Sequence, residues 1–179
     1  MGGAAEVGRG LPGEVAALPD GKDIDHCIQC GMCTATCPVA EAVPGFSPRQ
    51  IIARTLMNLG EELLASDEIW YCARCQQCVA TCRKDIRPGD IITALRIIAI
   101  RMGYRKTAGA RHTLAFLGDI KKKGKLNEAT LAFKTLGMST ITMVPYAMRM
   151  MLKGKIPSPI VKKIEGLDEV RALVEEYRR

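Results

Sequence analysis

Eight cysteines stand in two runs of four, and their spacing constrains this chain more than any other feature of the sequence. The first run is Cys27, Cys30, Cys33 and Cys37, and the second run is Cys72, Cys75, Cys78 and Cys82. Both runs have the spacing C-x2-C-x2-C-x3-C. A short pattern that occurs twice predicts two related half-units, which we expect to face each other.

This spacing is typical of proteins that bind two [4Fe-4S] clusters. In such runs three thiolates surround three irons of one cubane, and the fourth cysteine reaches the other cubane. The pattern predicts ligand sets of Cys27, Cys30, Cys33 and Cys82 for the first cluster, and of Cys72, Cys75, Cys78 and Cys37 for the second. All eight cysteines are then used, and no iron is left open for substrate. We therefore expect electron relay and no catalytic residue.

Zinc sites and disulfides are the competing uses of eight cysteines. Zinc sites also use C-x2-C steps, but ligands taken in pairs leave the third cysteine of each run unexplained. Disulfides fit the even count, yet Glu6, Arg9 and Glu14 interrupt the apolar segment that an export signal needs. Because no export signal is present, we expect a cytoplasmic protein. In a reducing compartment, thiols serve more often as metal ligands than as disulfides.

The net charge of +7 is compatible with an acidic partner, an anionic membrane surface or nucleic acid. No known nucleic-acid motif accompanies the charge, so we expect no nucleic-acid partner. The uncharged stretch 135–148 contains Pro145 and falls short of the roughly 18 to 20 apolar residues that span a bilayer. No transmembrane segment is predicted.

Helical patterns follow each cysteine run. Ser47, Pro48 and Gln50 form a helix-start signal, which predicts a helix to about Leu59 that stops at Gly60. A second, short helix is expected over 66–70. After the second run, Pro88 begins a predicted helix with an apolar stripe, terminated by Gly103; the stripe comprises Ile91, Leu95, Ile98, Ala99 and Met102.

The remainder of the chain is also predicted to be helical. Helices are expected over 111–122, 126–136, 142–152 and 167–178, separated by Gly124, Gly137, Gly154 and the break Pro157-Ser158-Pro159. No alternating pattern typical of strands competes with them. The methionines clustered between 138 and 151 suit either core packing or a partner-binding surface.

Charge and glycine content distinguish the two cysteine runs. Arg74, Arg83, Lys84 and Arg87 lie within or just after the second run, whereas the loop of the first run has no basic residue. Because nearby positive charge raises the reduction potential of a cluster, we predict the higher potential for the second cluster. Gly31 of the first run has Gln76 as its counterpart, so we also expect the two loops to differ there.

Both cysteine runs, together with the stretch 87–92 (Arg-Pro-Gly-Asp-Ile-Ile), resemble the C subunit of heterodisulfide reductase, the enzyme of methanogens and related anaerobes. The resemblance extends more loosely to 151–157 and 167–170. The cysteine pattern alone identifies the wider group of α-helical ferredoxin modules, also found in succinate dehydrogenase and fumarate reductase iron-sulfur subunits. Arg83 departs from that pattern, which usually has proline after the last cysteine, as Pro38 is in the first run. We therefore expect an altered loop after Cys82.

The resemblance implies an all-α fold in which an α-helical ferredoxin domain carries additional C-terminal helices. The resemblance does not cover residues 1–22, whose six Gly and two Pro among small residues predict a flexible or partner-docking arm. The other expected parts are the ferredoxin domain with two [4Fe-4S] clusters (23–105) and a helical extension for subunit contacts (106–179).

The implied role is a non-catalytic electron-transfer subunit of an oxidoreductase complex. Such a subunit passes electrons from the flavin-containing A subunit of heterodisulfide reductase to the B subunit, which reduces the coenzyme M-coenzyme B heterodisulfide. A larger hydrogenase- or formate dehydrogenase-linked complex is a further candidate partner. Two alternatives remain open: the equivalent subunit of a sulfur-oxidising or quinone-linked complex, and a stand-alone dicluster ferredoxin.

Overall fold

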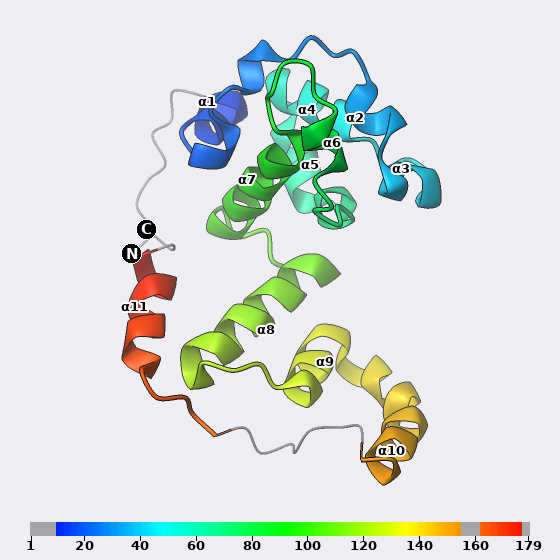
Figure 1. The fold of residues 1–179 in the computed structure, drawn as a ribbon, viewed down its shortest axis with the longest axis vertical. Helices are drawn as coiled ribbons and strands as arrows, with labels where there is room; N and C mark the ends of the chain where they lie inside the picture. The colour runs from blue at the N-terminus through cyan, green and yellow to red at the C-terminus, as the bar shows by residue number, and fades with distance from the viewer. Residues whose placement is uncertain (1–9, 155–161, 177–179) are drawn as a thin grey trace. The chain divides into compact units, whose positions relative to one another are not determined.

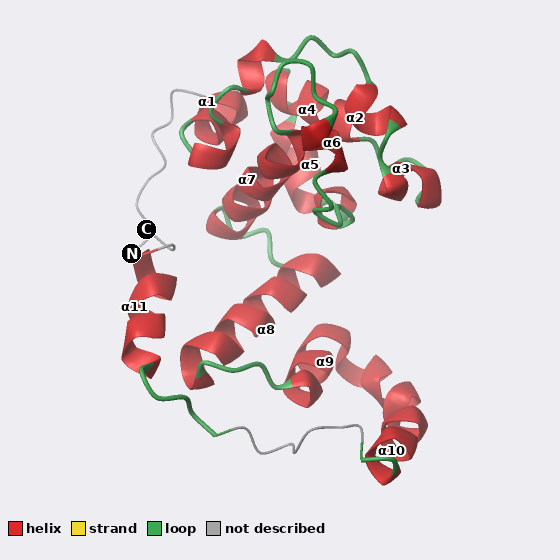
Figure 2. Cartoon of the chain, in the orientation of Figure 1, coloured by secondary structure: helices red, strands yellow, loops and turns green. Residues whose placement is uncertain are grey.

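The computed structural model describes residues 10–154 and 162–176, and within these ranges it contains helices and no strand (Figure 1; Figure 2). The all-α class is confirmed. The chain divides into two compact units between Thr107 and Ala108.

The first unit contains seven α-helices within the described range and three short 3₁₀ helices, labelled η. In chain order they are α1 (Gly10–Ala16), η1 (Pro19–Gly21), η2 (Ile24–His26), α2 (Met32–Ala35), α3 (Pro38–Ala42), α4 (Pro48–Leu56), α5 (Gly60–Ala65), η3 (Glu68–Trp70), α6 (Gln77–Ala80) and α7 (Pro88–Arg101).

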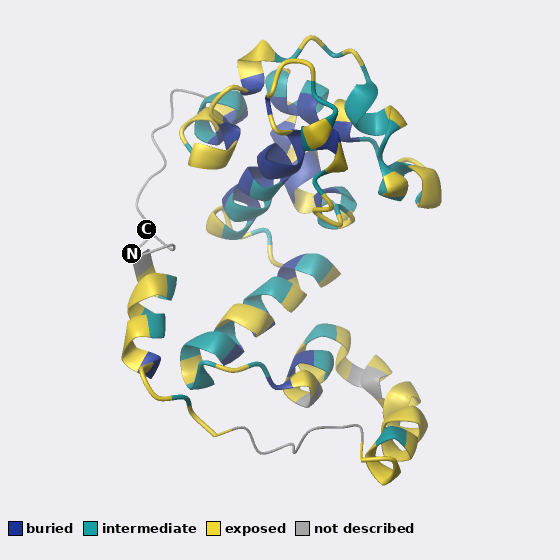
Figure 3. Cartoon of the chain, viewed as in Figure 1, coloured by how far each residue is buried: buried dark blue, intermediate teal, exposed yellow. Residues whose placement is uncertain are grey.

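The core of the first unit forms around α7, which packs against α1, α4, α5, α6, η1 and η3. Figure 3 shows its buried residues concentrated on α7 and α4. Ile51 and Ile52 of α4 and Ile91 and Leu95 of α7 are completely or almost completely buried. Burying a side chain of this size contributes roughly 1.5 to 3 kcal/mol, so the helix that follows each cysteine run anchors that run to one shared core.

The helix predicted to begin near Pro48 is α4, which ends earlier than predicted, at Leu56, and Gly60 begins α5 instead of stopping α4. The reason is Asn58, which turns the backbone with a φ of 57° and whose side-chain oxygen accepts a 2.7 Å hydrogen bond from Leu11 N–H. Leu59 therefore leaves the helical face and is exposed.

Part of the segment expected to be an arm packs into the first unit. Leu11 and Val15 of α1 are buried in the same core as α7. A Cβ atom on Gly60 would lie 2.3 Å from Leu11 Cδ2, so α5 approaches α1 as closely as a glycine permits. Residues 10–22 are therefore part of the compact unit, while 1–9 lie outside the described residues.

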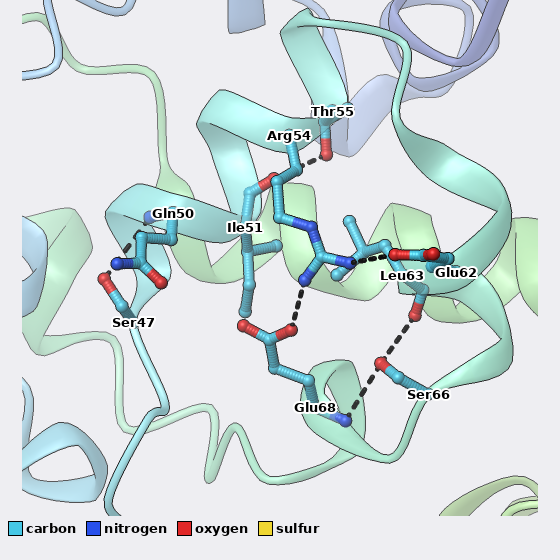
Figure 4. Close-up of polar contacts among 9 residues, drawn as sticks. All are labelled: Ser47, Gln50, Ile51, Arg54, Thr55, Glu62, Leu63, Ser66 and Glu68. Atoms are coloured by element: carbon cyan, nitrogen blue, oxygen red, sulfur yellow. Dashed lines mark hydrogen bonds and ion pairs between the residues drawn. The ribbon is translucent and has the colours of Figure 1, made fainter.

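Polar contacts hold the spacer between the two cysteine runs (Figure 4). Arg54 Nη1 donates to Glu68 Oε2 at 2.7 Å, and Arg54 Nη2 lies 3.9 Å from Glu62 Oε2. Ser66 Oγ donates to the Leu63 carbonyl and accepts from Glu68 N–H, which begins η3 at the position that the sequence indicated. Ser47 Oγ accepts from Gln50 N–H at 3.3 Å, so the predicted N-cap of α4 is present.

The helix after the second run starts at Pro88 as predicted, and Gly103, with a φ of 90°, follows its end. Four residues of the predicted stripe are buried: Ile91, Leu95, Ile98 and Ala99. Met102 is the exception, because it caps the helix and is 53 % exposed.

The second unit contains α8 (Ala108–Lys123), α9 (Glu128–Leu136), η4 (Gly137–Met143), α10 (Val144–Leu152) and α11 (Leu167–Glu176). These bounds differ by a few residues from the predicted ones. Asn127 caps α9 by accepting from Thr130 N–H, and Asp119 of α8 pairs with Lys134 of α9 at 2.6 Å. The Pro157-Ser158-Pro159 break and the end of the last predicted helix lie outside the described residues.

Apolar side chains remain uncovered along α10, where no residue is buried (Figure 3). Met143, Met148 and Met151 are all exposed, so core packing does not account for these three methionines. Within the described ranges, none of the helices combines the length and the apolar character needed to cross a membrane.

Candidate iron-sulfur cluster sites

The eight cysteines line two separate hollows of the first unit, four around each. The first hollow is lined by Cys27, Cys30, Cys33 and Cys82. The second is lined by Cys72, Cys75, Cys78 and Cys37. Each hollow thus brings together three cysteines of one run and the last cysteine of the other, and all eight are free thiols.

The two cysteine loops have the same backbone conformation. The residue before the second cysteine has a positive φ in both loops, 54° at Gln29 and 53° at Arg74. The residue after that cysteine does so too, with φ of 82° at Gly31 and 64° at Gln76, and each of these two residues caps a short helix. The prediction that the loops differ at this position is therefore wrong.

Gln76 adopts its positive φ because its side chain is held by another element. Gln76 Nε2 donates to Asp90 Oδ1 of α7 at 3.1 Å, while Gln76 Oε1 is buried without a hydrogen-bond partner. A left-handed conformation costs a residue other than glycine roughly 1 to 3 kcal/mol. The contact with α7 offsets that cost in the second loop, whereas glycine avoids it in the first.

A pair of threonines joins the loops between the two hollows. Thr36 and Thr81 stand immediately before Cys37 and Cys82, the two cysteines that reach across to the other hollow. Their hydroxyl oxygens lie 3.2 Å apart. Each hydroxyl oxygen also lies within hydrogen-bond distance of the carbonyl four residues earlier, at Met32 (2.9 Å) and Gln77 (3.0 Å), so one hydroxyl can donate to its own carbonyl while the other donates across the loops. The related half-units expected from the repeated motif therefore meet at equivalent residues.

The helices that follow the runs complete the hollows in the same crossed manner. Pro48, at the start of the helix after the first run, lines the second hollow. Pro88, at the start of the helix after the second run, lines the first hollow. Thr34 of the first loop is tied to α4 because its hydroxyl accepts from Arg49 N–H at 3.0 Å and lies 3.0 Å from Ser47 Oγ.

Burial distinguishes the thiols of the two hollows. Cys30 and Cys75 are exposed, whereas Cys78 is buried against the first turn of α7. Burial raises the pKa of the Cys78 thiol to about 11, Cys72 adds to the effect, and a hydrogen bond from the Gly89 backbone opposes it. Burial likewise raises the pKa of Cys33. Iron binds the thiolate, so cluster assembly must displace these protons.

A buried carboxylate lies beside the second hollow. Asp90 is 4 % exposed and accepts a 2.6 Å charge-assisted hydrogen bond from Arg87 Nε. Arg74 Nη2 lies 3.8 Å from its other oxygen. Arg74 and Arg87 therefore compensate most of the charge on Asp90. From the sequence, both arginines had been expected to add positive charge beside the second cluster.

Arg96 of α7 holds the chain that leads into the second run. Its guanidinium donates to the carbonyl oxygens of Ile69, Trp70 and Cys72 at 2.8, 3.2 and 2.6 Å. It also lies 5.5 Å from the centre of the Trp70 ring. Burial lowers the pKa of Arg96, and the nearby Cys72 opposes that shift. Sequence reasoning missed this residue, since nothing in the pattern of α7 separates it from a surface arginine.

The basic residues around the hollows differ from the expected distribution. Arg83 and Lys84 line the first hollow, because they directly follow Cys82, which lines the same hollow. Arg49 of α4 lines it as well. Among the described residues, Arg74 is the only charged one that lines the second hollow. The premise that positive charge gathers at the second cluster is therefore wrong, and the predicted order of the two potentials loses its support.

The loop after Cys82 has the altered shape that Arg83 led us to expect. Pro38 begins α3 directly after Cys37, whereas the chain after Cys82 makes a turn in which Asp85 N–H donates to the Cys82 carbonyl. Asp85 has a φ of 53°. The substitution of arginine for proline thus coincides with the loss of a helix and leaves Cys82 at the first hollow.

The donor set fits iron-sulfur clusters better than mononuclear metal sites. In the ranges 10–154 and 162–176, no three His, Cys, Asp or Glu side chains converge closely enough to hold a single ion. A zinc site needs thiolates at about 2.3 Å from one ion, whereas a [4Fe-4S] cluster takes four thiolates around a larger body. Four thiols spread around a hollow match the second arrangement.

Residues 23–86 match the 4Fe-4S dicluster domain family. This range includes both cysteine runs and the helical spacer between them. The chain binds two [4Fe-4S] clusters, as the spacing predicted.

Several curated proteins are similar to this chain. The ferredoxin:CoB-CoM heterodisulfide reductase C subunit of Methanosarcina acetivorans is 41 % identical over 87 residues, which cover 49 % of this chain and 34 % of that protein. The H(2):CoB-CoM heterodisulfide,ferredoxin reductase C subunit of Methanothermobacter thermautotrophicus is 24 % identical over 155 residues, or 86 % of this chain and 75 % of that protein. The 8-methylmenaquinol:fumarate reductase iron-sulfur subunit of Wolinella succinogenes is 27 % identical over 142 residues, or 73 % and 44 %.

The extent of these matches matters. This chain spans about a third of the length of the Methanosarcina protein that it matches. The match to the Methanothermobacter protein covers 155 residues and therefore extends beyond the first unit, which ends at Thr107, into the second. Residues 23–86 are thus similar to 4Fe-4S dicluster domains, and the chain as a whole is similar to C subunits of heterodisulfide reductases.

Proposed function

We propose that this chain is the electron-transfer subunit of a heterodisulfide reductase and that its eight cysteines hold two clusters in crossed sets. Cys27, Cys30, Cys33 and Cys82 hold one cluster, and Cys72, Cys75, Cys78 and Cys37 hold the other. The clusters supply one-electron storage and transfer. The chain positions them through the paired loops and the helices α4 and α7.

The observation that carries this proposal is the lining of the two hollows. Each hollow has four cysteine thiols, which is the full ligand set of a [4Fe-4S] cluster. Since these sets use every cysteine of the chain, no thiol is left for disulfide chemistry. We therefore propose a non-catalytic role here and place the chemistry on substrate in another part of the complex.

The proposed route runs from the flavin-containing A subunit of the reductase, through this chain, to the B subunit that reduces the coenzyme M-coenzyme B heterodisulfide. The relatives named as C subunits of heterodisulfide reductases support this assignment. The second unit, with the exposed apolar side chains of α10, is proposed to contact other subunits. Eight free thiols favour a reducing compartment, so the proposed location is the cytoplasm.

A second candidate is the equivalent subunit of a quinone-linked complex. The similarity to the iron-sulfur subunit of a menaquinol:fumarate reductase covers 73 % of this chain and supports it. A stand-alone dicluster ferredoxin is the third candidate, but the second unit would then have no partner for its uncovered side chains.

The deciding experiment is anaerobic purification of the tagged full chain from its native cells, followed by mass spectrometry of what co-purifies. We expect a flavoprotein and a cysteine-rich subunit in fixed stoichiometry. Electrons from the flavoprotein should then reduce the added heterodisulfide. Recovery of the chain only as a free monomer would contradict the proposal, and recovery with a quinone-reactive subunit would favour the second candidate.

A further inference from the structure

The first hollow has a rim of three exposed cations. Arg49 comes from α4, and Arg83 and Lys84 come from the loop after Cys82, so two distant parts of the chain supply the same rim. No residue that lines this hollow is acidic, and the rim cations have no ion pair within the described residues. Three like charges that form no ion pair make the potential at the rim locally more positive.

An exposed apolar side chain and an exposed cysteine lie within this rim. Ile28 lines the hollow and is 56 % exposed, and the neighbouring Cys30 is also exposed. An exposed apolar centre with a charged border is the usual composition of a protein-binding patch. Cys30 is a point at which a cluster held here would lie near solvent.

The second hollow lacks such a rim. Within the described part of the chain, Arg74 is its only charged lining residue, and Arg74 lies 3.8 Å from the buried Asp90. The other residues of its lining are neutral: Val39, Pro48, Ala73, Gln76, Gln77, Ile92 and the four cysteines. The two hollows therefore present different surfaces to whatever exchanges electrons with them.

We propose that the rim formed by Arg49, Arg83 and Lys84 around the first hollow is a docking surface for an acidic electron-transfer protein or domain. Charge complementarity identifies the partner: its contact face carries Asp and Glu around its own redox centre. The second hollow has one lining cation, which lies 3.8 Å from Asp90, and attracts that face less, so the acidic partner exchanges electrons through the first cluster. This inference rests on the proposed relay function. It adds that an acidic redox partner exchanges electrons with the first cluster of the relay.

Electrostatic steering explains why such a rim is useful. Complementary charges raise association rates by roughly 10 to 1,000 fold at low ionic strength. Electron-transfer encounters bury little surface and dissociate readily, so long-range attraction can set their rate without a large apolar interface. Exposed cations of this kind act on association more than on final affinity.

The test measures the second-order rate at which a prereduced, acidic [2Fe-2S] ferredoxin reduces the full chain with both clusters loaded. The variants are Arg49→Glu, Lys84→Glu and the double variant, which avoid Arg83 because it adjoins the ligand Cys82. Arg101→Glu is the matched control. It makes the same charge change as each single variant, on an exposed residue of α7 that is 13 residues from Pro88 at the first hollow, or about 20 Å along the helix.

For the native chain we expect the rate to fall about tenfold or more between roughly 0.01 M and 0.3 M salt, as the Debye length shortens. The double variant should be slower by about tenfold at low salt and should equal the native chain at high salt, where steering is screened. Arg101→Glu should follow the native chain throughout. An equal loss in Arg101→Glu, or a loss in the double variant that persists at high salt, would overturn the docking surface.

Reduction by a neutral, photoreduced deazaflavin separates this inference from the relay function. If deazaflavin reduces both clusters and the rim variants show no charge effect with the ferredoxin, the docking surface alone fails. If the fully loaded clusters accept no electron even from deazaflavin, the relay function fails as well. Redox titrations followed by electron paramagnetic resonance (EPR) of each variant identify a loss caused by a changed potential, which also counts against docking.

Discussion

The two cysteine loops have almost the same backbone but different surroundings. Both have positive φ angles at equivalent positions, and both end on a threonine that contacts its counterpart. The first hollow is rimmed by exposed Arg49, Arg83 and Lys84, while the second adjoins buried Asp90 and the Arg96 clamp of α7. The repeated motif thus gives both loops the same backbone, while the surrounding helices give each hollow its own charges and accessibility.

The largest effects are expected from substitution of Cys82 and Cys37, the last cysteine of each run, because each is proposed to bind the cluster of the other run. We predict that Cys82→Ser removes the first cluster and Cys37→Ser the second, because each thiol lines the hollow of the other run. Each variant should lose about four irons per chain. Iron analysis and EPR spectra of the reduced protein provide the measurement.

Cys30→Ser and Cys75→Ser are the reference variants, since these exposed cysteines line the hollow of their own run. Cys82→Ser should give the spectrum of Cys30→Ser, and Cys37→Ser that of Cys75→Ser. The reverse correspondence would refute the crossed ligand sets.

Arg96→Met should destabilise the second hollow more than the first. The change leaves the Ile69, Trp70 and Cys72 carbonyls without their charged donor, which we expect to cost roughly 3 kcal/mol. The measurement is the denaturant concentration at which helicity and each cluster's EPR signal are lost.

Arg96→Lys keeps the positive charge but not the planar fork of donors, so it should recover only part of the loss. Arg101→Met, at an exposed position of the same helix, should stay within about 0.5 kcal/mol of the native chain. Equal sensitivity of the two clusters to Arg96→Met would show that the clamp does not belong to the second hollow.

Asp90→Asn should raise the reduction potential of the second cluster. Removing the buried negative charge leaves Arg87 and Arg74 uncompensated, and positive surroundings stabilise the more negative, reduced cluster. We expect an upward shift on the order of tens of millivolts, with a smaller shift of the first cluster. Redox titration monitored by EPR measures both potentials, and a larger shift of the first cluster would contradict this assignment.

The smallest effects are expected at Thr36 and Thr81, the equivalent residues at which the two loops touch. Thr36→Val and Thr81→Val should each cost roughly 1 kcal/mol, because each breaks the hydroxyl contact between the loops. The double variant should cost less than the sum, since both changes remove the same bond. Denaturant unfolding measures these losses, and Thr→Ser at each position, which keeps the hydroxyl, is the control. Strictly additive losses would mean that the two hydroxyls do not interact.

Local signals in the sequence predicted part of the fold correctly. Ser47 and Pro48 start α4, and Pro88 starts α7, because capping and proline geometry depend on neighbouring residues. The end of α4 could not be predicted in this way. It depends on a hydrogen bond between Asn58 and Leu11, which are 47 residues apart, and the helix α5 that follows was missed for the same reason.

The candidate site shows the same division. The comparison of Gly31 with Gln76 misled the sequence interpretation because intrinsic backbone preference favours glycine at a positive φ. The contact of Gln76 with Asp90, from another helix, overrides that preference. Arg96 could not be recognised at all, since its three carbonyl partners lie 24 to 27 residues away.

Cysteine spacing is a local property of the sequence, and it was enough to predict two [4Fe-4S] clusters. The charges that surround each hollow, in contrast, follow from how the chain folds in space. Arg83 and Lys84 follow the second run in the chain, yet they reach the first hollow because Cys82 crosses to it. The electrostatic interaction between two charges depends on their distance in space. Because the chain crosses from one site to the other at Cys82, residues that follow the second run in the sequence lie close to the first hollow.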